Sequence, residues 1–122
     1  MRWGIPMSTL RVTTVTNPSG GQPTIDGLAK AWVNFNGTGT VAIRASFNVS
    51  SITDNGVGQY TVNLTTAMAD ANYSVGVNTD YDGVSFGINA KTFATTSFLI
   101  QCILPNLSNY TDKSIVNAQI FR

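Results

Sequence analysis

The chain of 122 residues contains no histidine and no glutamate, and it has a single cysteine. Without histidine, neither a Ser-His-Asp nor a Cys-His arrangement nor a histidine-ligated zinc site can be built. One cysteine cannot form a disulfide within the chain, and the apolar neighbours of Cys102 favour a buried, inert thiol. We therefore expect no enzyme and no cofactor.

Without glutamate, any catalytic pair of carboxylates must come from the six aspartates. The close pair is Asp80 and Asp82, which precede Gly83. Two carboxylates at this spacing could hold a hard cation or act as an acid and a base. An Asp-Gly sequence also forms β-turns very often, and we favour the turn.

Charged residues make up only 11% of the chain, where an average domain has about 25%. The net charge is +1, and the seven lysines and arginines are spread along the sequence. Phosphate neutralisation needs a basic patch, so we expect no nucleic-acid partner. No segment is apolar and long enough for a membrane span, and the N-terminus has no apolar stretch long enough for a signal peptide, so nothing marks the chain for export. Met7 is a second candidate start beside Met1.

Threonine, asparagine, serine and glycine replace the missing charges, and such β-branched and turn-forming residues favour strands and tight turns. Alternating or apolar runs occur at residues 29–36, 41–50, 60–64, 73–77, 84–88, 98–104 and 114–121. Asn55-Gly56 is a strong hairpin signal. The pattern predicts an all-β, antiparallel, jelly-roll-like β-sandwich over residues 29–122. In the run 41–50, Val41, Ile43, Ala45, Phe47 and Val49 are expected to share the inward face.

Residues 1–28 differ from the rest of the chain. Leu10, Val12 and Val15 belong to a short alternating run, which a linker with two prolines and two glycines follows. We interpret this segment as an extended arm for docking or for interlacing subunits. A first strand of the same sandwich followed by a long loop is the alternative.

In two runs, 98–104 and 114–121, apolar residues occupy both the odd and the even positions. A strand of a sandwich normally exposes one of its two faces to water. We infer that their second face is covered as well. The favoured cover is another copy of the chain, with Leu99, Ile103, Ile115 and Phe121 at the interface, and loops of the same chain are the alternative.

Exposed aromatic residues are the remaining candidates for binding. Tyr73, Tyr81 and Tyr110 lie in or beside loops rich in asparagine, aspartate and serine, with Asp82 next to Tyr81. Flat rings with polar neighbours suit sugar or protein surfaces. Ordinary half-buried tyrosines at strand ends are the alternative.

Five parts of the sequence carry a further pattern: AKAWVNFNGTGTVAIR at 29–44, SFNVSSITDNG at 46–56, Gly58, YTVN at 60–63 and ANY at 71–73. Together they resemble the distal modules of bacteriophage tail fibres and tailspikes. The resemblance implies a homotrimeric β-sandwich tip on the exterior of a virion, made in the bacterial cytoplasm, that touches host surface polysaccharide. It brings no catalytic residues.

A fibre usually has a long shaft before its tip, and here some 28 residues precede it. We therefore expect a trimeric capsid decoration (cement) protein that contacts the major capsid protein through the arm. A detachable tail-fibre tip bound to a tail protein is the alternative, and a carbohydrate-binding module is a further one.

Overall fold

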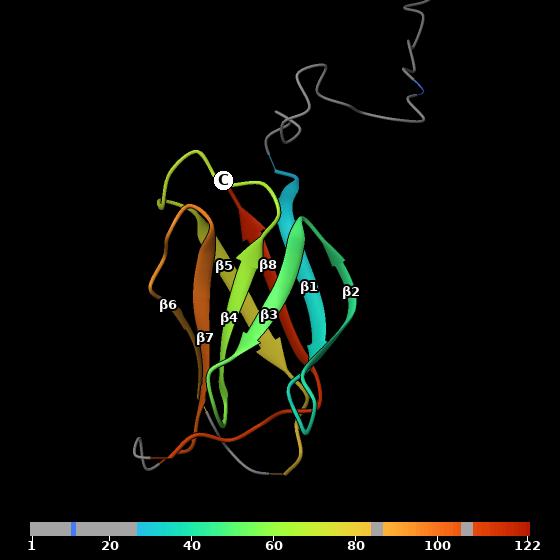
Figure 1. Ribbon diagram of the computed structural model, residues 1–122, viewed down its shortest axis with the longest axis vertical. Helices are drawn as coiled ribbons and strands as arrows, with labels where there is room; N and C mark the ends of the chain where they lie inside the picture. The colour runs from blue at the N-terminus through green and yellow to red at the C-terminus, as the bar shows by residue number, and fades with distance from the viewer. Residues whose placement is uncertain (1–10, 12–26, 84–86, 106–108) are drawn as a thin grey trace, which may run out of the picture.

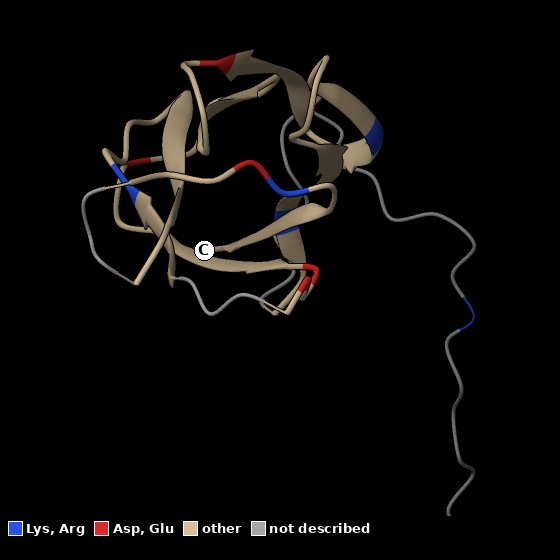
Figure 2. Cartoon of the chain, turned by 90° about the horizontal axis from the view of Figure 1, so that it is seen from below, with Lys and Arg blue, Asp and Glu red and all other residues tan. Residues whose placement is uncertain are grey.

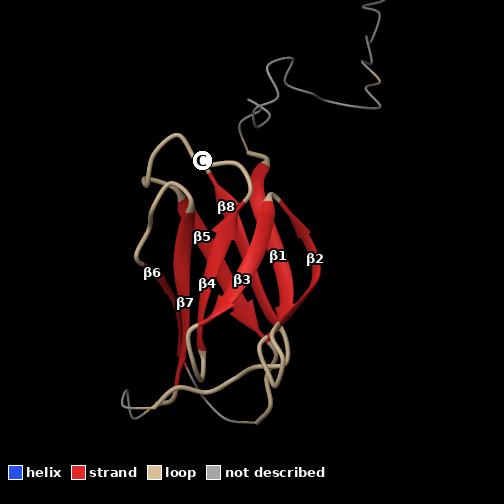
Figure 3. Cartoon of the chain, viewed as in Figure 1, coloured by secondary structure: helices blue, strands red, loops and turns tan. Residues whose placement is uncertain are grey.

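The structure, a computed structural model, describes residues 11, 27–83, 87–105 and 109–122. The described residues form strands and loops and contain no helix (Figure 3). The strands are β1 (Ala29–Asn36), β2 (Ala42–Phe47), β3 (Val49–Asp54), β4 (Gln59–Leu64), β5 (Ser74–Thr79), β6 (Gly87–Lys91), β7 (Ser97–Ile103) and β8 (Val116–Phe121).

The strands form two four-stranded sheets that pack face to face (Figure 1). Sheet A has the order β2-β1-β8-β5 and sheet B the order β3-β4-β7-β6. Every neighbouring pair is antiparallel. The predicted all-β antiparallel sandwich is therefore confirmed. Residues 12–26 of the predicted arm, with Val12 and Val15, and Leu10 lie outside the described residues.

The strand order departs from a jelly roll. Three neighbouring pairs, β1-β2, β3-β4 and β6-β7, join strands that follow each other in sequence. In a jelly roll, whose two Greek keys run across both sheets, strands that follow each other in sequence mostly lie in opposite sheets. The sandwich is thus assembled from hairpins that β4-β7, β1-β8 and β5-β8 pairings join.

The core lies between the sheets, where alternate residues of the four central strands meet. Its largest members are fully buried: Tyr60, Phe35, Phe98, Ile100, Ile120, Val33, Val62, Val116 and Cys102. Phe35 of sheet A meets the ring of Tyr60 of sheet B edge-on at 5.2 Å between centroids. Each such side chain contributes about 1.5–3 kcal/mol by leaving water, so this interface between the sheets holds most of the stability.

The predicted Asn55-Gly56 hairpin is confirmed. It joins β3 to β4, with Asp54 opposite Tyr60. Gly56 has φ +120°, and its N–H donates to the Asp54 carboxylate at 2.9 Å. A glycine is suited to this backbone conformation because it has no Cβ.

The predicted inward face of the run 41–50 is wrong at Ala45 and Phe47, whereas Val49 is buried in the core, and Val41 and Ile43 pack against it. Phe35 is opposite Ile43 while Asn34 is opposite Ala45, so Arg44 is an extra residue in a β-bulge. A bulge of one residue reverses which face the following side chains take. Ala45 and Phe47 therefore lie on the outer face of sheet A, where both are exposed.

The run 41–50 is also two strands and not one. Asn48 separates β2 from β3 and has φ +55°, a conformation that asparagine tolerates better than most residues. Its amide nitrogen donates to the carbonyl oxygens of Lys30 and Thr66, and its amide oxygen accepts from the Thr66 N–H at 2.7 Å. These bonds fix the point at which the chain crosses from sheet A to sheet B.

Three loops at one end of the sandwich are tied together through Asp112 and Tyr60. Its Oδ1 accepts from the Gly58 N–H at 2.7 Å and lies 2.8 Å from the Tyr60 hydroxyl, which is also 2.9 Å from the Gly37 carbonyl oxygen. A Cβ on Gly37 would lie 2.5 Å from the Tyr60 hydroxyl oxygen. We call this end, at the bottom of Figure 1, the Tyr110 end, and the opposite one the C-terminal end.

Substitution of Gly58 by alanine tests the close packing at this end. Gly58 has φ +62°, and a Cβ there would lie 2.6 Å from the Thr111 carbonyl oxygen and 2.8 Å from that of Cys102. Gly39 has nearly the same φ, +60°, with nothing within 4 Å. The conformational cost of about 1–2 kcal/mol is shared by both variants, whereas overpacking adds about 1–3 kcal/mol at Gly58 alone. Urea unfolding should show Gly58→Ala to be less stable than Gly39→Ala by that amount. Equal stabilities would contradict the packing described.

Candidate functional site

The two close aspartates are both engaged by side chains of the same chain. Asp80 accepts from the Ser114 hydroxyl at 2.6 Å and the Ile115 N–H at 3.1 Å, and the Ser114 bond lowers the pKa of its carboxyl group. Asp82 pairs with the buried Lys113 ammonium at 2.7 Å. The described residues contain no group of three or more Asp or Cys side chains that could hold a metal ion. The pair therefore joins the 80–83 loop to the segment before β8.

Three of the four predicted ligand-contact residues lie at the Tyr110 end. Tyr81 is 78% exposed, Asp82 is exposed, and Tyr110 is 37% exposed. The Tyr110 hydroxyl lies 3.3 Å from the amide nitrogen of Gln101, and the Tyr110 backbone forms a bridge with Ile103. Tyr81 thus projects from this end, whereas Tyr110 lies along β7.

Tyr73, the fourth predicted contact residue, is part of the core and is unavailable to a ligand. Its ring is buried and meets Phe93 and Phe98 edge-on at 5.4 and 6.3 Å. Its hydroxyl donates to the carbonyl oxygen of Ala94 at 2.8 Å and lies 3.1 Å from that of Ser97. Burial raises the pKa of this hydroxyl. Tyr73 fixes the β6–β7 loop, as a tyrosine at a strand end often does.

The predicted interface residues do not share one surface within a chain. Leu99 and Ile103 lie on the outer face of sheet B, and both are half-buried. Phe121 lies on the outer face of sheet A, and Ile115 lies at the Tyr110 end. Part of the cover over β7 comes from the chain itself, since residues 109–111 bond to Cys102 and Leu104 and bridge to Ile103.

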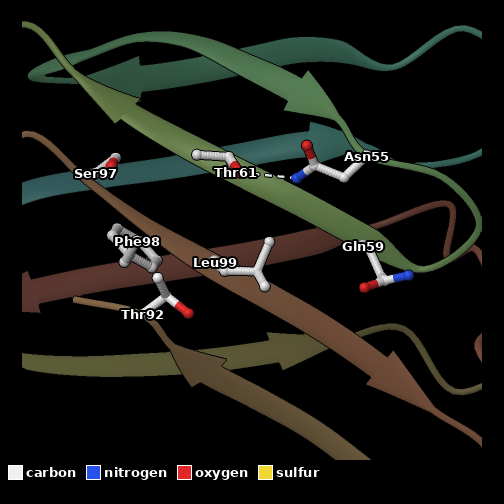
Figure 4. A pocket seen from close by; sticks show the side chains of 7 residues that line it. All are labelled: Asn55, Gln59, Thr61, Thr92, Ser97, Phe98 and Leu99. Carbon is white, nitrogen blue, oxygen red and sulfur yellow. Dashed lines mark hydrogen bonds between the residues drawn. The ribbon is translucent and has the colours of Figure 1, made fainter. Parts of the chain in front are cut away.

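A pocket of about 360 Å³ opens on the outer side of sheet B (Figure 4). It is lined by Asn55, Gln59, Thr61, Thr92, Ser97, Phe98 and Leu99. Gln59 is opposite Gln101, and Thr61 is opposite Leu99, so hydroxyl and amide groups lie beside the Leu99 side chain. Asn55 donates to the Thr61 hydroxyl at 2.7 Å, which fixes one rim. The lining carries no charged residue.

The outer face of sheet A combines exposed aromatic rings with a row of amides. Trp32 lies opposite Phe47 of β2 and Gln119 of β8, and the two rings are 39% and 41% exposed. One row further along, Asn34 donates to Asn117 at 2.5 Å, and Asn117 donates to Asn78 at 2.7 Å. We call this surface the amide–aromatic face; it comprises Trp32, Phe47, Gln119, Asn34, Asn117 and Asn78.

Alternation along β1 puts Trp32 on the outer face, but the rest of this surface was missed in the sequence. Each asparagine occupies an outward position of its own strand, yet only the register of β1, β8 and β5 brings the three together. The Arg44 bulge then adds Phe47 beside Trp32. The sequence signal that could have indicated this surface is an asparagine at an outward position of each of three strands.

Lysine, arginine and aspartate residues are spread over the strands and loops and do not gather on one side (Figure 2). In the described ranges, no helix is both apolar and long enough to cross a bilayer.

A scan against protein-family models found no match to the chain, and neither did a search of the curated proteins nor a search of the solved structures.

Cys102 is the chain's single thiol, and its chemistry can be tested directly. Its side chain is fully buried, and burial raises its pKa to about 11. The thiolate is the reactive form, so little of it exists at pH 8. Iodoacetamide should label the native protein at a small fraction of the rate seen in urea, as measured by mass spectrometry. Labelling of the native protein at the rate of the unfolded chain would contradict the burial of this thiol.

Proposed function

We propose that the chain is a non-enzymatic structural protein of a bacteriophage virion, a trimeric capsid decoration (cement) protein whose sandwich faces outward. The supporting observation is that the two ends of the sandwich differ. Ala29 and Phe121 are paired, so the arm joins β1 beside the end of β8, at the C-terminal end. The Tyr110 end carries the Asp112 hydrogen bonds and the exposed Tyr81. This polarity suits attachment at one end and presentation of the other.

The arrangement of apolar residues supports self-association. In a ring of subunits each interface joins two different surfaces, so the residues on either side need not lie together in one chain. Leu99 and Ile103 on sheet B of one subunit could therefore meet Phe121 on sheet A of the next. Phe121 is 43% exposed and stands at the C-terminal end of its sheet. Three such contacts would close a trimer with the arms on one side.

A detachable tail-fibre tip remains the second candidate. The likeness of residues 29–73 to fibre and tailspike tips favours it as much as the capsid role. In that case the arm contacts a tail protein in place of the major capsid protein. The partner of the arm is what distinguishes the two.

Binding to emptied capsids of the phage that encodes the chain tests the proposal. A protein that binds only the assembled shell stabilises it by mass action, by about 2.7 kcal/mol at a concentration 100 times Kd. The melting temperature of the shell, followed by calorimetry, should therefore rise and saturate with added protein. No rise at saturating protein would contradict the cement role and favour the tail.

Removal of residues 1–28 tests the arm. The buried core comes from residues 31–120, so the shortened protein should keep its fold and its oligomeric state. It should no longer sediment with capsids, because the docking segment is gone. Retained sedimentation would assign docking to the sandwich itself. A Leu10→Asp, Val12→Asp double variant of the full chain is the matched control for the apolar residues of the arm.

A further inference from the structure

We propose that the amide–aromatic face of sheet A binds an uncharged polysaccharide, with a sugar ring stacked on Trp32 and sugar hydroxyls bonded to the neighbouring amides. This inference deepens the proposed function and rests on it in one respect, that the sandwich faces outward in the virion. In the proposed trimer only Phe121, at the end of this face, is used. The inference requires that this contact leave the rows of Trp32 and Asn34 uncovered.

The aromatic part of the face is a pair of adjacent rings. Trp32 and Phe47 are directly opposite residues of antiparallel strands, whose Cβ atoms are about 4.5–5.5 Å apart. Both rings are about two-fifths exposed, in a protein with only two tryptophans. Tryptophan offers a large apolar surface together with one N–H donor. A sugar ring has an apolar C–H face and a polar rim, and it complements such a surface.

The face is flat beside Trp32 because of Gly76. Gly76 is opposite Gln119, and a Cβ at Gly76 would lie 3.2 Å from the Gln119 amide oxygen. The Gln119 amide therefore lies across β5, over the glycine. The row from Phe47 through Trp32 to Gln119 gives two rings followed by an amide on a level surface. A ligand could lie along this row without meeting a projecting side chain at position 76.

The asparagine row holds amides in fixed orientations. In each of its two bonds an Nδ2 atom donates to the Oδ1 atom of the next asparagine, from Asn34 to Asn117 and from Asn117 to Asn78. Within the described part of the chain, this leaves the Oδ1 atom of Asn34 as an acceptor and the Nδ2 atom of Asn78 as a donor. A hydroxyl both donates and accepts, so sugar hydroxyls can satisfy both ends of the row.

Charge and size select the class of ligand. The two rows consist of Phe47, Trp32, Gln119 and Gly76, and of Ala45, Asn34, Asn117 and Asn78, with no charged residue. An acidic polysaccharide would be recognised by arginine or lysine, which the rows do not contain. Four strands of six residues cover about 400 Å², about half of the roughly 800 Å² per partner of a stable protein interface. A chain of a few sugars fits this area better than a protein does.

Affinity electrophoresis in gels that contain dextran, mannan or galactan tests the inference, with alginate as an acidic comparison. At least one neutral polysaccharide should retard the full-length protein. Trp32→Ala should weaken that retardation at least tenfold, and Asn78→Ala several-fold. Val57→Ala, which removes an exposed apolar side chain from the β3–β4 turn, should have no effect. In a Trp3→Phe background, the same polysaccharide should change the fluorescence of Trp32, now the single tryptophan.

Three results would overturn the inference. They are no retardation by any neutral polysaccharide, equal retardation of the wild type and of a folded Trp32→Ala protein, and stronger binding to alginate than to the neutral polymers. If Trp32→Ala changes the molecular mass in solution, a second copy covers the face and the inference is also wrong. The gel and fluorescence results do not depend on capsids. Capsid stabilisation by the Trp32→Ala protein then tests the proposed function separately.

Discussion

The carboxylate of Asp112 is the contact on which the rest of the structure depends most. Its Oδ1 receives the Gly58 N–H and lies beside the Tyr60 hydroxyl, so it connects the segment before β8 to the β3–β4 hairpin. Tyr60 in turn spans the core to the Gly37 carbonyl oxygen. Burial, with the Asp112 bond second, raises the pKa of the Tyr60 hydroxyl. A charged phenolate is therefore disfavoured in the fold, and this stability is present below the ordinary tyrosine pKa of about 10 and lost above it.

This constraint has consequences for both faces of the sandwich. When the loops at the Tyr110 end are fixed, the strands that they join keep their pairing. The pairing of neighbouring strands decides which side chains lie next to each other on the outer face of each sheet. On sheet B it places Leu99 beside hydroxyl and amide groups. On sheet A it places Trp32 beside Phe47 and aligns three asparagines. The surfaces offered to partners are thus set by buried contacts at a distance from them.

Much of the fold could be predicted from the sequence because alternation and turn chemistry are local. Asn55-Gly56 identified its hairpin, and the inward positions of β1 follow from Ala31, Val33 and Phe35. The Arg44 bulge could not be predicted from the sequence. Apolar and polar residues keep alternating through positions 43–47, although the extra residue reverses the faces on which their side chains lie. The strand order was also beyond local signals, because β1-β8 and β5-β8 pairings join residues far apart.

The candidate sites were harder to predict for the same reason. A tyrosine beside a polar loop can project, as Tyr81 does, or fill the core, as Tyr73 does, and the sequence around the two is similar. The asparagine row exists only once three strands are in register. Individual exposed residues could therefore be named in advance, whereas surfaces composed of several strands could not.

The central claim is that sister chains cover Leu99, Ile103 and Phe121, which each sandwich leaves on its outer faces. Light scattering of the full chain at micromolar concentration measures this most directly. The account predicts a particle of three times the 13.0 kDa chain mass that persists on dilution. A stable 13.0 kDa monomer would contradict it.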